Sequence, residues 1–183
     1  MQDVLVRNRA EFELLPDEGF WEVVEGRAIL VPPPELDHQD LSTRLLLMLS
    51  EQLKHLGYGY VVAAVNVFVP PPEGSFGTVQ SRVPDLIVAR NRPAERFELG
   101  EPPELVIEIL STRRGNVERT EKLDDYARGG IGEYWIVNPF AREVEVYRLS
   151  SGEYVGFETG HALLRPQAFP GVEIDIDRIW PAR

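Results

Sequence analysis

Two acidic residues interrupt segments of the sequence that are otherwise apolar. Asp85 opens the segment VPDLIVAR, and Glu108 lies in the middle of PELVIEILST, among Leu, Val and Ile. A short apolar run bounded by proline and polar residues predicts a strand that is buried on both faces of a sheet. Because an unpaired carboxylate in such a place costs several kcal/mol, Glu108 must be protonated, paired with a cation or bound to a metal.

Together the two carboxylates predict a site for a hard divalent cation. Their strands follow one another in the sequence, so we expect Asp85 and Glu108 to converge in space. Mg²⁺ usually keeps several waters and takes only one or two protein carboxylates, so this pair is sufficient. Two alternatives stay open. In the first, Glu108 forms a buried ion pair with Arg119 or Lys122 and binds no metal. In the second, Asp85, which follows a proline, has only a role in a turn.

Lys122 stands out because lysine is rare in this chain. The sequence has seventeen arginines and only two lysines, Lys54 and Lys122. Arginine is a planar fork that keeps its proton, whereas lysine is a compact charge that orients a water or, when its pKa is lowered, accepts a proton. A lysine near two carboxylates therefore indicates catalysis, and the alternative is a solvated lysine on a helix.

Several elements precede the segment with Asp85. Residues 8–15 predict a short helix, and WEVVEGRAILVP predicts a hairpin that turns at Glu25 and Gly26. From Asp37 to Gly57 the apolar residues recur at helical spacing, with Asp37 as the N-cap and Gly57 as the stop. YVVAAVNVFVPPP predicts one long strand, and EGSFGTVQSR predicts a loop.

Residues 104–138 predict a strand, a helix and a second strand. The helix runs from Asn116 to about Arg128, and the strand EYWIVNP follows. Two strands joined in this way are expected to be parallel with a right-handed crossover. The alternation in REVEVYRL predicts a hairpin or meander at the edge. We expect one α/β domain of mixed α+β type over residues 1–183.

Composition excludes several classes of protein. The chain has no cysteine, which excludes thiolate catalysis and zinc sites built on cysteine. A net charge of -11 argues against electrostatic coating of nucleic acid. Residues 80–128, however, hold nine basic and ten acidic side chains, so an anionic substrate is best tolerated there. The longest purely apolar run, LLLML, is too short to cross a bilayer, so we expect a cytoplasmic protein without a membrane partner.

The segments VPDLIVA, PPELVIEILS and ERTEKLDDYARGGIGEYWIVNP together resemble the Uma-two-type restriction-endonuclease family, a branch of the PD-(D/E)XK nuclease superfamily. The similarity extends to WEVVEGRAI, to His38 and to FPGVEIDIDRIW, so it covers nearly the whole chain. It implies a restriction-endonuclease-like fold, with a central mixed sheet flanked by helices. To this fold we add the N-terminal hairpin and the C-terminal hairpin or meander.

The resemblance also implies a set of site residues. Asp85 and Glu108 would bind Mg²⁺ or Mn²⁺, with the carbonyl of Ile109 as a third ligand, and Lys122 would orient the attacking water or offset charge in the transition state. The superfamily places its lysine two residues after the Glu, where this chain has Leu110. Lys122, one helix later, matches the displaced lysine of the family.

Further candidates surround this core. Glu22 is a candidate to complete the site or hold a second metal, His38 to donate to a phosphate, and Tyr126 to hold Lys122 in place. The ordinary alternatives are a surface carboxylate, a histidine at a helix start and a core aromatic residue. Three arginines after the strand of Glu108 are candidates for contacts with nucleic acid, although a solvated turn is the default: Arg113, Arg114 and Arg119.

Three functions fit these observations. The first is a Mg²⁺-dependent endonuclease that hydrolyses phosphodiester bonds of nucleic acid, with DNA as the expected substrate and a homodimer as the expected assembly. The second is a catalytically silent interaction or assembly module on the same fold. The third is a metal hydrolase for small phosphoesters. The carboxylate pair separates the first two, because only a nuclease requires it to bind metal.

Overall fold

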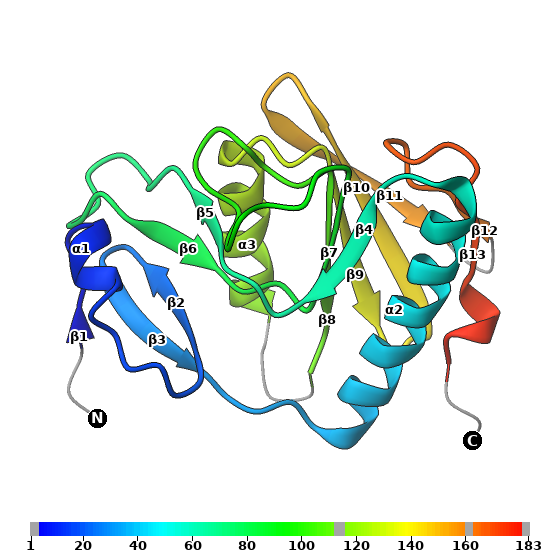
Figure 1. Cartoon of the computed structure of the whole chain (residues 1–183), viewed down its shortest axis with the longest axis horizontal. Coiled ribbons are helices and arrows are strands. Elements are labelled where there is room, and N and C mark those ends of the chain that lie inside the picture. Colours follow the sequence, from blue (N-terminus) through cyan, green and yellow to red (C-terminus); the bar gives the residue numbers. More distant parts are fainter. Residues whose placement is uncertain (1–3, 112–115, 160–162, 181–183) are drawn as a thin grey trace.

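The computed structural model of the protein describes residues 4–111, 116–159 and 163–180. Two β-sheets lie beside one another, with helix α3 between them in the view of Figure 1. The large sheet has the strand order β11-β10-β9-β8-β7-β4. Its strands are β4 (Tyr60–Ala63), β7 (Leu86–Ala89), β8 (Leu105–Ile109), β9 (Glu133–Asn138), β10 (Glu143–Ser150) and β11 (Glu153–Thr159).

The large sheet is mixed, as expected. β8 and β9 are parallel, as predicted, and they are joined by α3 (Asn116–Arg128). All other pairs in this sheet are antiparallel, including the C-terminal hairpin of β10 and β11. Every residue of β8 is buried, which confirms the prediction of a strand covered on both faces.

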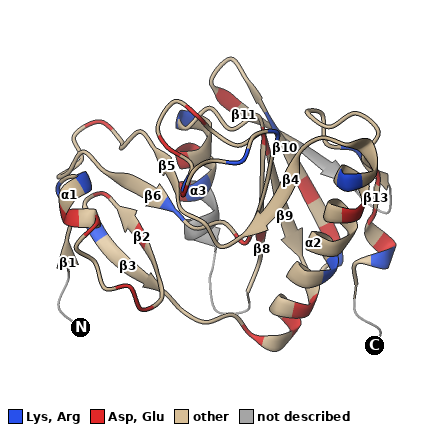
Figure 2. Ribbon diagram, in the orientation of Figure 1, with Lys and Arg blue, Asp and Glu red and all other residues tan. Residues whose placement is uncertain are grey.

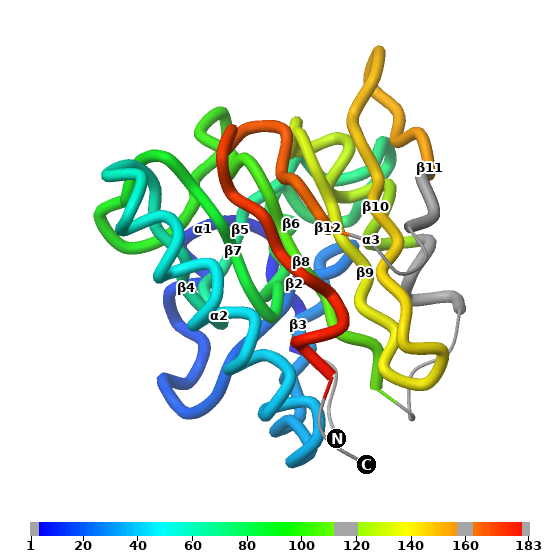
Figure 3. The backbone as a smooth tube through the Cα atoms, turned by 90° about the vertical axis from the view of Figure 1, so that its right-hand side faces the viewer, coloured from blue at the N-terminus to red at the C-terminus, as the bar shows by residue number. Residues whose placement is uncertain are grey.

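The two faces of the large sheet are covered by different elements. Leu105 and Ile107 of β8 pack in one core with α2 (Leu36–Leu56), which contributes Leu41, Leu45, Leu49 and Leu53. The C-terminal segment completes this core through β12 (Leu163–Leu164), β13 (Ile174–Asp175) and the 3-10 helix η1 (Ile176–Arg178), which cross the sheet in Figure 3. Val106 of β8 packs instead with Tyr126 of α3, so α3 covers the opposite face.

The small sheet is antiparallel and has the strand order β1-β3-β2-β6-β5. Its strands are β1 (Val4–Leu5), β2 (Phe20–Val24), β3 (Arg27–Val31), β5 (Val67–Val69) and β6 (Gln80–Arg82), and the short helix α1 (Arg9–Phe12) packs on it. The predicted hairpin of β2 and β3 turns at Glu25 and Gly26, whose φ angles of 49° and 79° suit a tight two-residue turn.

Three boundaries differ from the sequence prediction. The expected long strand is broken at Ala64, whose φ of 53° redirects the chain, so β4 joins the large sheet and β5 the small one. Part of the expected loop EGSFGTVQSR is the buried strand β6. Its polar side chains can be buried because Gln80 and Arg82 both donate to the carboxylate of Asp125. Helix α2 begins at Leu36 with Glu35 as N-cap, and Asp37 lies inside its first turn.

None of the helices in the described part of the chain combines the length and the apolar character needed to cross a membrane.

The C-terminal end of α3 approaches the small sheet closely at Gly129. A Cβ atom added there would lie 2.7 Å from Cγ1 of Val69 in β5. We expect Gly129→Ala to lower the free energy of unfolding by about 1–3 kcal/mol through overpacking. In urea denaturation, the double variant Gly129→Ala/Val69→Ala should lose less free energy of unfolding than the two single variants lose together. Simple additivity would contradict this close contact.

Candidate functional site

Asp85 and Glu108 lie opposite one another on adjacent strands. β7 and β8 are antiparallel with Leu86 opposite Ile107, and one further step of this register places Asp85 opposite Glu108. Directly opposite residues of an antiparallel pair project on the same face. Glu108 is 8% exposed and shares the face of Val106, which packs against α3. The sheet therefore brings the two predicted carboxylates together.

Helix α3 supplies the partners of Glu108. Lys122 Nζ lies 2.7 Å from Oε1 of Glu108, and the Tyr126 hydroxyl donates to the same oxygen at 2.6 Å. The two donors are four residues apart, so they lie on one stripe of the helix. Both are buried, which excludes the alternative of a solvated lysine for Lys122. Glu108 and Lys122 thus form the buried ion pair that the sequence offered as an alternative to a metal site.

Burial and charge shift the pKa values of this pair. Burial raises the pKa of Glu108 to about 7, while the Lys122 charge acts in the opposite direction and the Asp85 charge adds to the rise. Burial works against the charge on Lys122, but Glu108 and Glu22 outweigh it and hold its pKa above its ordinary value. Lys122 therefore keeps its proton here. This favours a cationic role over the role of a general base.

Asp85 is held by the opposite strand and by the start of α2. Its Oδ2 accepts a hydrogen bond from the backbone N–H of Ile109 at 2.7 Å and lies 3.1 Å from Nε2 of His38. Burial lowers the pKa of His38, but the hydrogen bond and charge of Asp85 outweigh this and raise it. Nδ1 of His38 is buried without a hydrogen-bond partner in the described part of the chain. The ring therefore holds Asp85 through Nε2, and its contact with a phosphate stays a prediction.

Glu22 reaches the same cluster from the small sheet. Its Oε1 accepts from the backbone N–H of Val83 at 3.2 Å and lies 3.5 Å from Nζ of Lys122. Its Oε2 accepts from Arg82 at 3.2 Å. Burial works against ionisation, but the charges of Lys122 and Arg82 outweigh it and hold the pKa of Glu22 below its ordinary value. Glu22 is thus ionised and is a buried residue, not the surface carboxylate of the alternative interpretation.

A second buried ion pair was not predicted from the sequence. Nε of Arg82 donates to Oδ2 of Asp125 at 2.6 Å, and Gln80 donates to the same oxygen at 2.9 Å. Arg82 and Gln80 come from β6, which lies beside α3 (Figure 2). All three residues of QSR are polar, so this segment carried no apolar period that would signal a buried strand. A strand that faces a buried helix normally alternates apolar residues there.

The remaining predicted site residues fall into two groups. Ile109 adjoins Glu108, and its N–H is bound to Asp85, so its backbone lies at the site. Arg113 and Arg114 lie outside the described residues, and so does the side chain of Arg119. The contacts of these three arginines with nucleic acid stay predictions.

The chemistry of the donor set fits a hard divalent cation. The described residues contain no group of three or more His, Asp or Glu side chains placed to hold a metal. Among their hydrogen bonds, however, none uses Oδ1 of Asp85 or Oε2 of Glu108. One oxygen of each carboxylate is thus held by protein donors, and the other is left for a ligand. Such a pair, with a backbone carbonyl and waters, matches what Mg²⁺ accepts.

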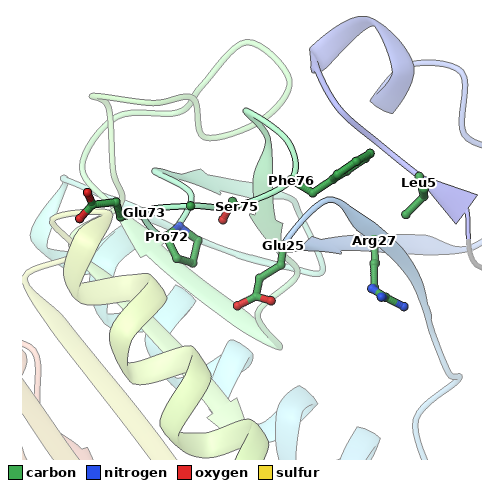
Figure 4. A pocket seen from close by; sticks show the side chains of 8 residues that line it. Leu5, Glu25, Arg27, Pro72, Glu73, Ser75 and Phe76 are labelled. Atoms are coloured by element: carbon green, nitrogen blue, oxygen red, sulfur yellow. The ribbon is translucent and has the colours of Figure 1, made fainter.

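A pocket of about 390 Å³ opens elsewhere on the molecule (Figure 4). It lies between the turn of β2 and β3 and the loop before β6, and its lining includes Leu5, Arg27 and Phe76. None of the predicted site residues lines it. The candidate site is thus an ion cluster between layers and is distinct from this pocket.

Removal of the Lys122 charge tests the ion pair directly. Lys122→Met leaves Glu108 and Glu22 without this cation, so we expect urea denaturation at pH 8 to show a loss of about 3–5 kcal/mol. The double variant Lys122→Met/Glu108→Leu should recover part of that loss. Lys54→Met, on the exposed side of α2, is the matched control and should stay within about 0.5 kcal/mol. Equal stability of the two lysine variants would contradict the pair.

Comparisons with known proteins identify the fold and the family. A crystal structure of a "putative nuclease belonging to DUF820" from Anabaena variabilis has the same fold, with a TM-score of 0.73. The two chains are 22% identical, and the alignment covers 93% of this chain and 96% of that one. No curated protein matches the sequence. The model of the Uma2 family, described as "Putative restriction endonuclease", matches residues 9–177. This protein therefore belongs to the Uma2 family.

Proposed function

We propose that this protein is a metal-dependent endonuclease that hydrolyses phosphodiester bonds of nucleic acid, with DNA as its substrate. The observation that carries the proposal is the convergence of Asp85, Glu108 and Lys122 at one point between the large sheet and α3. Membership of the Uma2 family supports it, because the description of that family is "Putative restriction endonuclease".

In this proposal the ligands are Asp85, Glu108 and the carbonyl of Ile109. When bound there, Mg²⁺ or Mn²⁺ supplies Lewis-acid polarisation of the phosphate and a water of lowered pKa. Asp85 is kept in register by Ile109 and His38, which each engage its Oδ2. Glu108 is kept in place by Tyr126 through its Oε1. Preorganised ligands of this kind reduce the reorganisation needed during the reaction.

Lys122 has a different task. Because its pKa is held above the ordinary value, it stays protonated and cannot act as the base. A fixed ammonium group beside the carboxylates stabilises negative charge that develops on the phosphate, and in this proposal it also orients the attacking water. The base would then be a second water or a substrate oxygen.

The charge of the protein limits how it binds nucleic acid. With a net charge of -11, we expect weak binding that decreases steeply with salt. A homodimer would present two sites to the two strands of a duplex and would gather the basic segments of both chains. Cleavage of both strands therefore fits a dimer better than a monomer.

A second candidate is a catalytically silent assembly module on the same fold. One observation favours it. Nζ of Lys122 lies 2.7 Å from Oε1 of Glu108, so the carboxylate has a cationic partner without any metal. The two candidates differ in one requirement. A silent module needs the ion pair for stability alone, whereas the nuclease also needs Asp85, which has no cationic partner apart from His38 among the described residues.

A cleavage assay with Asp85→Asn tests the proposal. Supercoiled plasmid, single-stranded DNA and RNA are incubated with wild type in Mg²⁺, in Mn²⁺ and in EDTA. We expect metal-dependent cleavage, and a loss of about 100-fold or more in Asp85→Asn, because the amide is a poorer metal ligand and carries no charge. Asp40→Asn, a partly exposed carboxylate paired with Arg44, is the matched control and should retain activity.

The outcomes of this assay separate the candidates. Equal cleavage by wild type and Asp85→Asn would contradict the assigned site. Cleavage of a chromogenic phosphodiester without cleavage of any polynucleotide would favour a hydrolase for small phosphoesters. No cleavage of any substrate, with either ion, would favour the silent module.

A further inference from the structure

The guanidinium of Arg82 is a buried bridge between the small sheet and α3. Arg82 is 2% exposed and lies at the end of β6. NH1 contacts Glu22 of β2 at 3.2 Å, and Nε contacts Asp125 of α3 at 2.6 Å. NH2 makes no hydrogen bond within the described residues and lies 3.7 Å from Oε2 of Glu121. One side chain thus binds carboxylates from two layers of the fold.

The partner of Arg82 on the small sheet contacts both halves of the candidate site. Glu22 accepts the backbone N–H of Val83, two residues before Asp85, and it lies 3.5 Å from the ammonium of Lys122. Both oxygens of Glu22 are therefore used, one by Arg82 and the other by Val83 and Lys122. A carboxylate held in this way orients its neighbours and has little capacity left to bind a metal.

The partner on α3 has a fixed relation to the proposed catalytic lysine. Asp125 and Lys122 are three residues apart, so they lie within one turn of the same helix. Gln80 of β6 also donates to Asp125, which ties this turn of α3 to β6, and Arg128 of the same helix binds Asp125 as well. A shift of α3 that released Asp125 from Arg82 would also move Lys122 away from Glu108.

From these contacts we infer that Arg82 is a positioning residue that sets Lys122 and the chain before Asp85 relative to Glu108. It acts through Glu22 and Asp125 and does not contact the reacting atoms. Its planar fork reaches two carboxylates at once, which the single ammonium of a lysine cannot reproduce with the same geometry. The effect on the reaction rate rests on the proposed nuclease function, whereas the coupling between Arg82 and Lys122 does not.

Arg82→Lys is the informative variant, because it keeps the positive charge and removes only the fork. Leu53→Ala, in the core beneath α2, is the matched control for lost stability without a change in the ion cluster. If the Arg82→Lys variant does not fold, Asp125→Asn takes its place, because it keeps the contact of Arg82 with Glu22. Each variant is made alone and together with Lys122→Met, and urea denaturation and plasmid cleavage are measured.

We expect two results. The change in unfolding midpoint of the double variant Arg82→Lys/Lys122→Met should differ from the sum of the changes in the two single variants. For Leu53→Ala and Lys122→Met, the change in the double variant should equal that sum. Arg82→Lys should lower kcat by about tenfold or more with KM nearly unchanged, since a small misplacement of a catalytic group affects the transition state. Leu53→Ala should change kcat little.

Each outcome decides the inference. Additive midpoints for Arg82→Lys and Lys122→Met would overturn it, and so would a fall in kcat no larger than that of Leu53→Ala. If wild type cleaves no phosphodiester, the proposed function fails separately. In that case the stability measurements alone support or overturn the positioning of Lys122.

Discussion

The cost of burying the carboxylate of Glu108 controls the arrangement around it. Its strand is covered on both faces, so its charge cannot be hydrated and must be offset by the protein or by a ligand. The chain offsets it with Lys122 and Tyr126, which α3 presents from one stripe. Even so, burial outweighs the charge of Lys122 and raises the pKa of Glu108 to about 7. A cation bound beside it would lower that pKa again.

This requirement connects the two sheets. Lys122 is shared between Glu108 of the large sheet and Glu22 of the small sheet, so neither sheet can move freely relative to α3. Arg82 strengthens the connection by binding Glu22 and Asp125 at once. The small sheet, which belongs to the N-terminal half of the chain, is thereby part of the candidate site rather than an independent addition.

The predictable parts of the structure are those that follow a hydrophobic period. The strand of Glu108, helix α2 and the parallel pair β8 and β9 were all predicted, and so was the approach of Asp85 to Glu108. The position of Lys122 one helix later did not establish that its side chain reaches Glu108, because that contact depends on how α3 packs on the sheet. Strand β6 was missed because it buries Gln80 and Arg82, whose stabilisation depends on Asp125 far along the sequence. The break at Ala64 was missed because a left-handed alanine carries no local signal, and only the pairing of β4 and β5 with different sheets requires it.

A metal site at Asp85 and Glu108 is tested by calorimetric titration of Mg²⁺ and Mn²⁺ into wild type and Glu108→Gln, with circular dichroism to establish that both are folded. We expect saturable binding to wild type and its loss in the folded variant, because the amide keeps the shape of the side chain and removes its charge. Binding of equal strength in the two proteins, or no binding to wild type in the millimolar range, would contradict a metal site at Asp85 and Glu108.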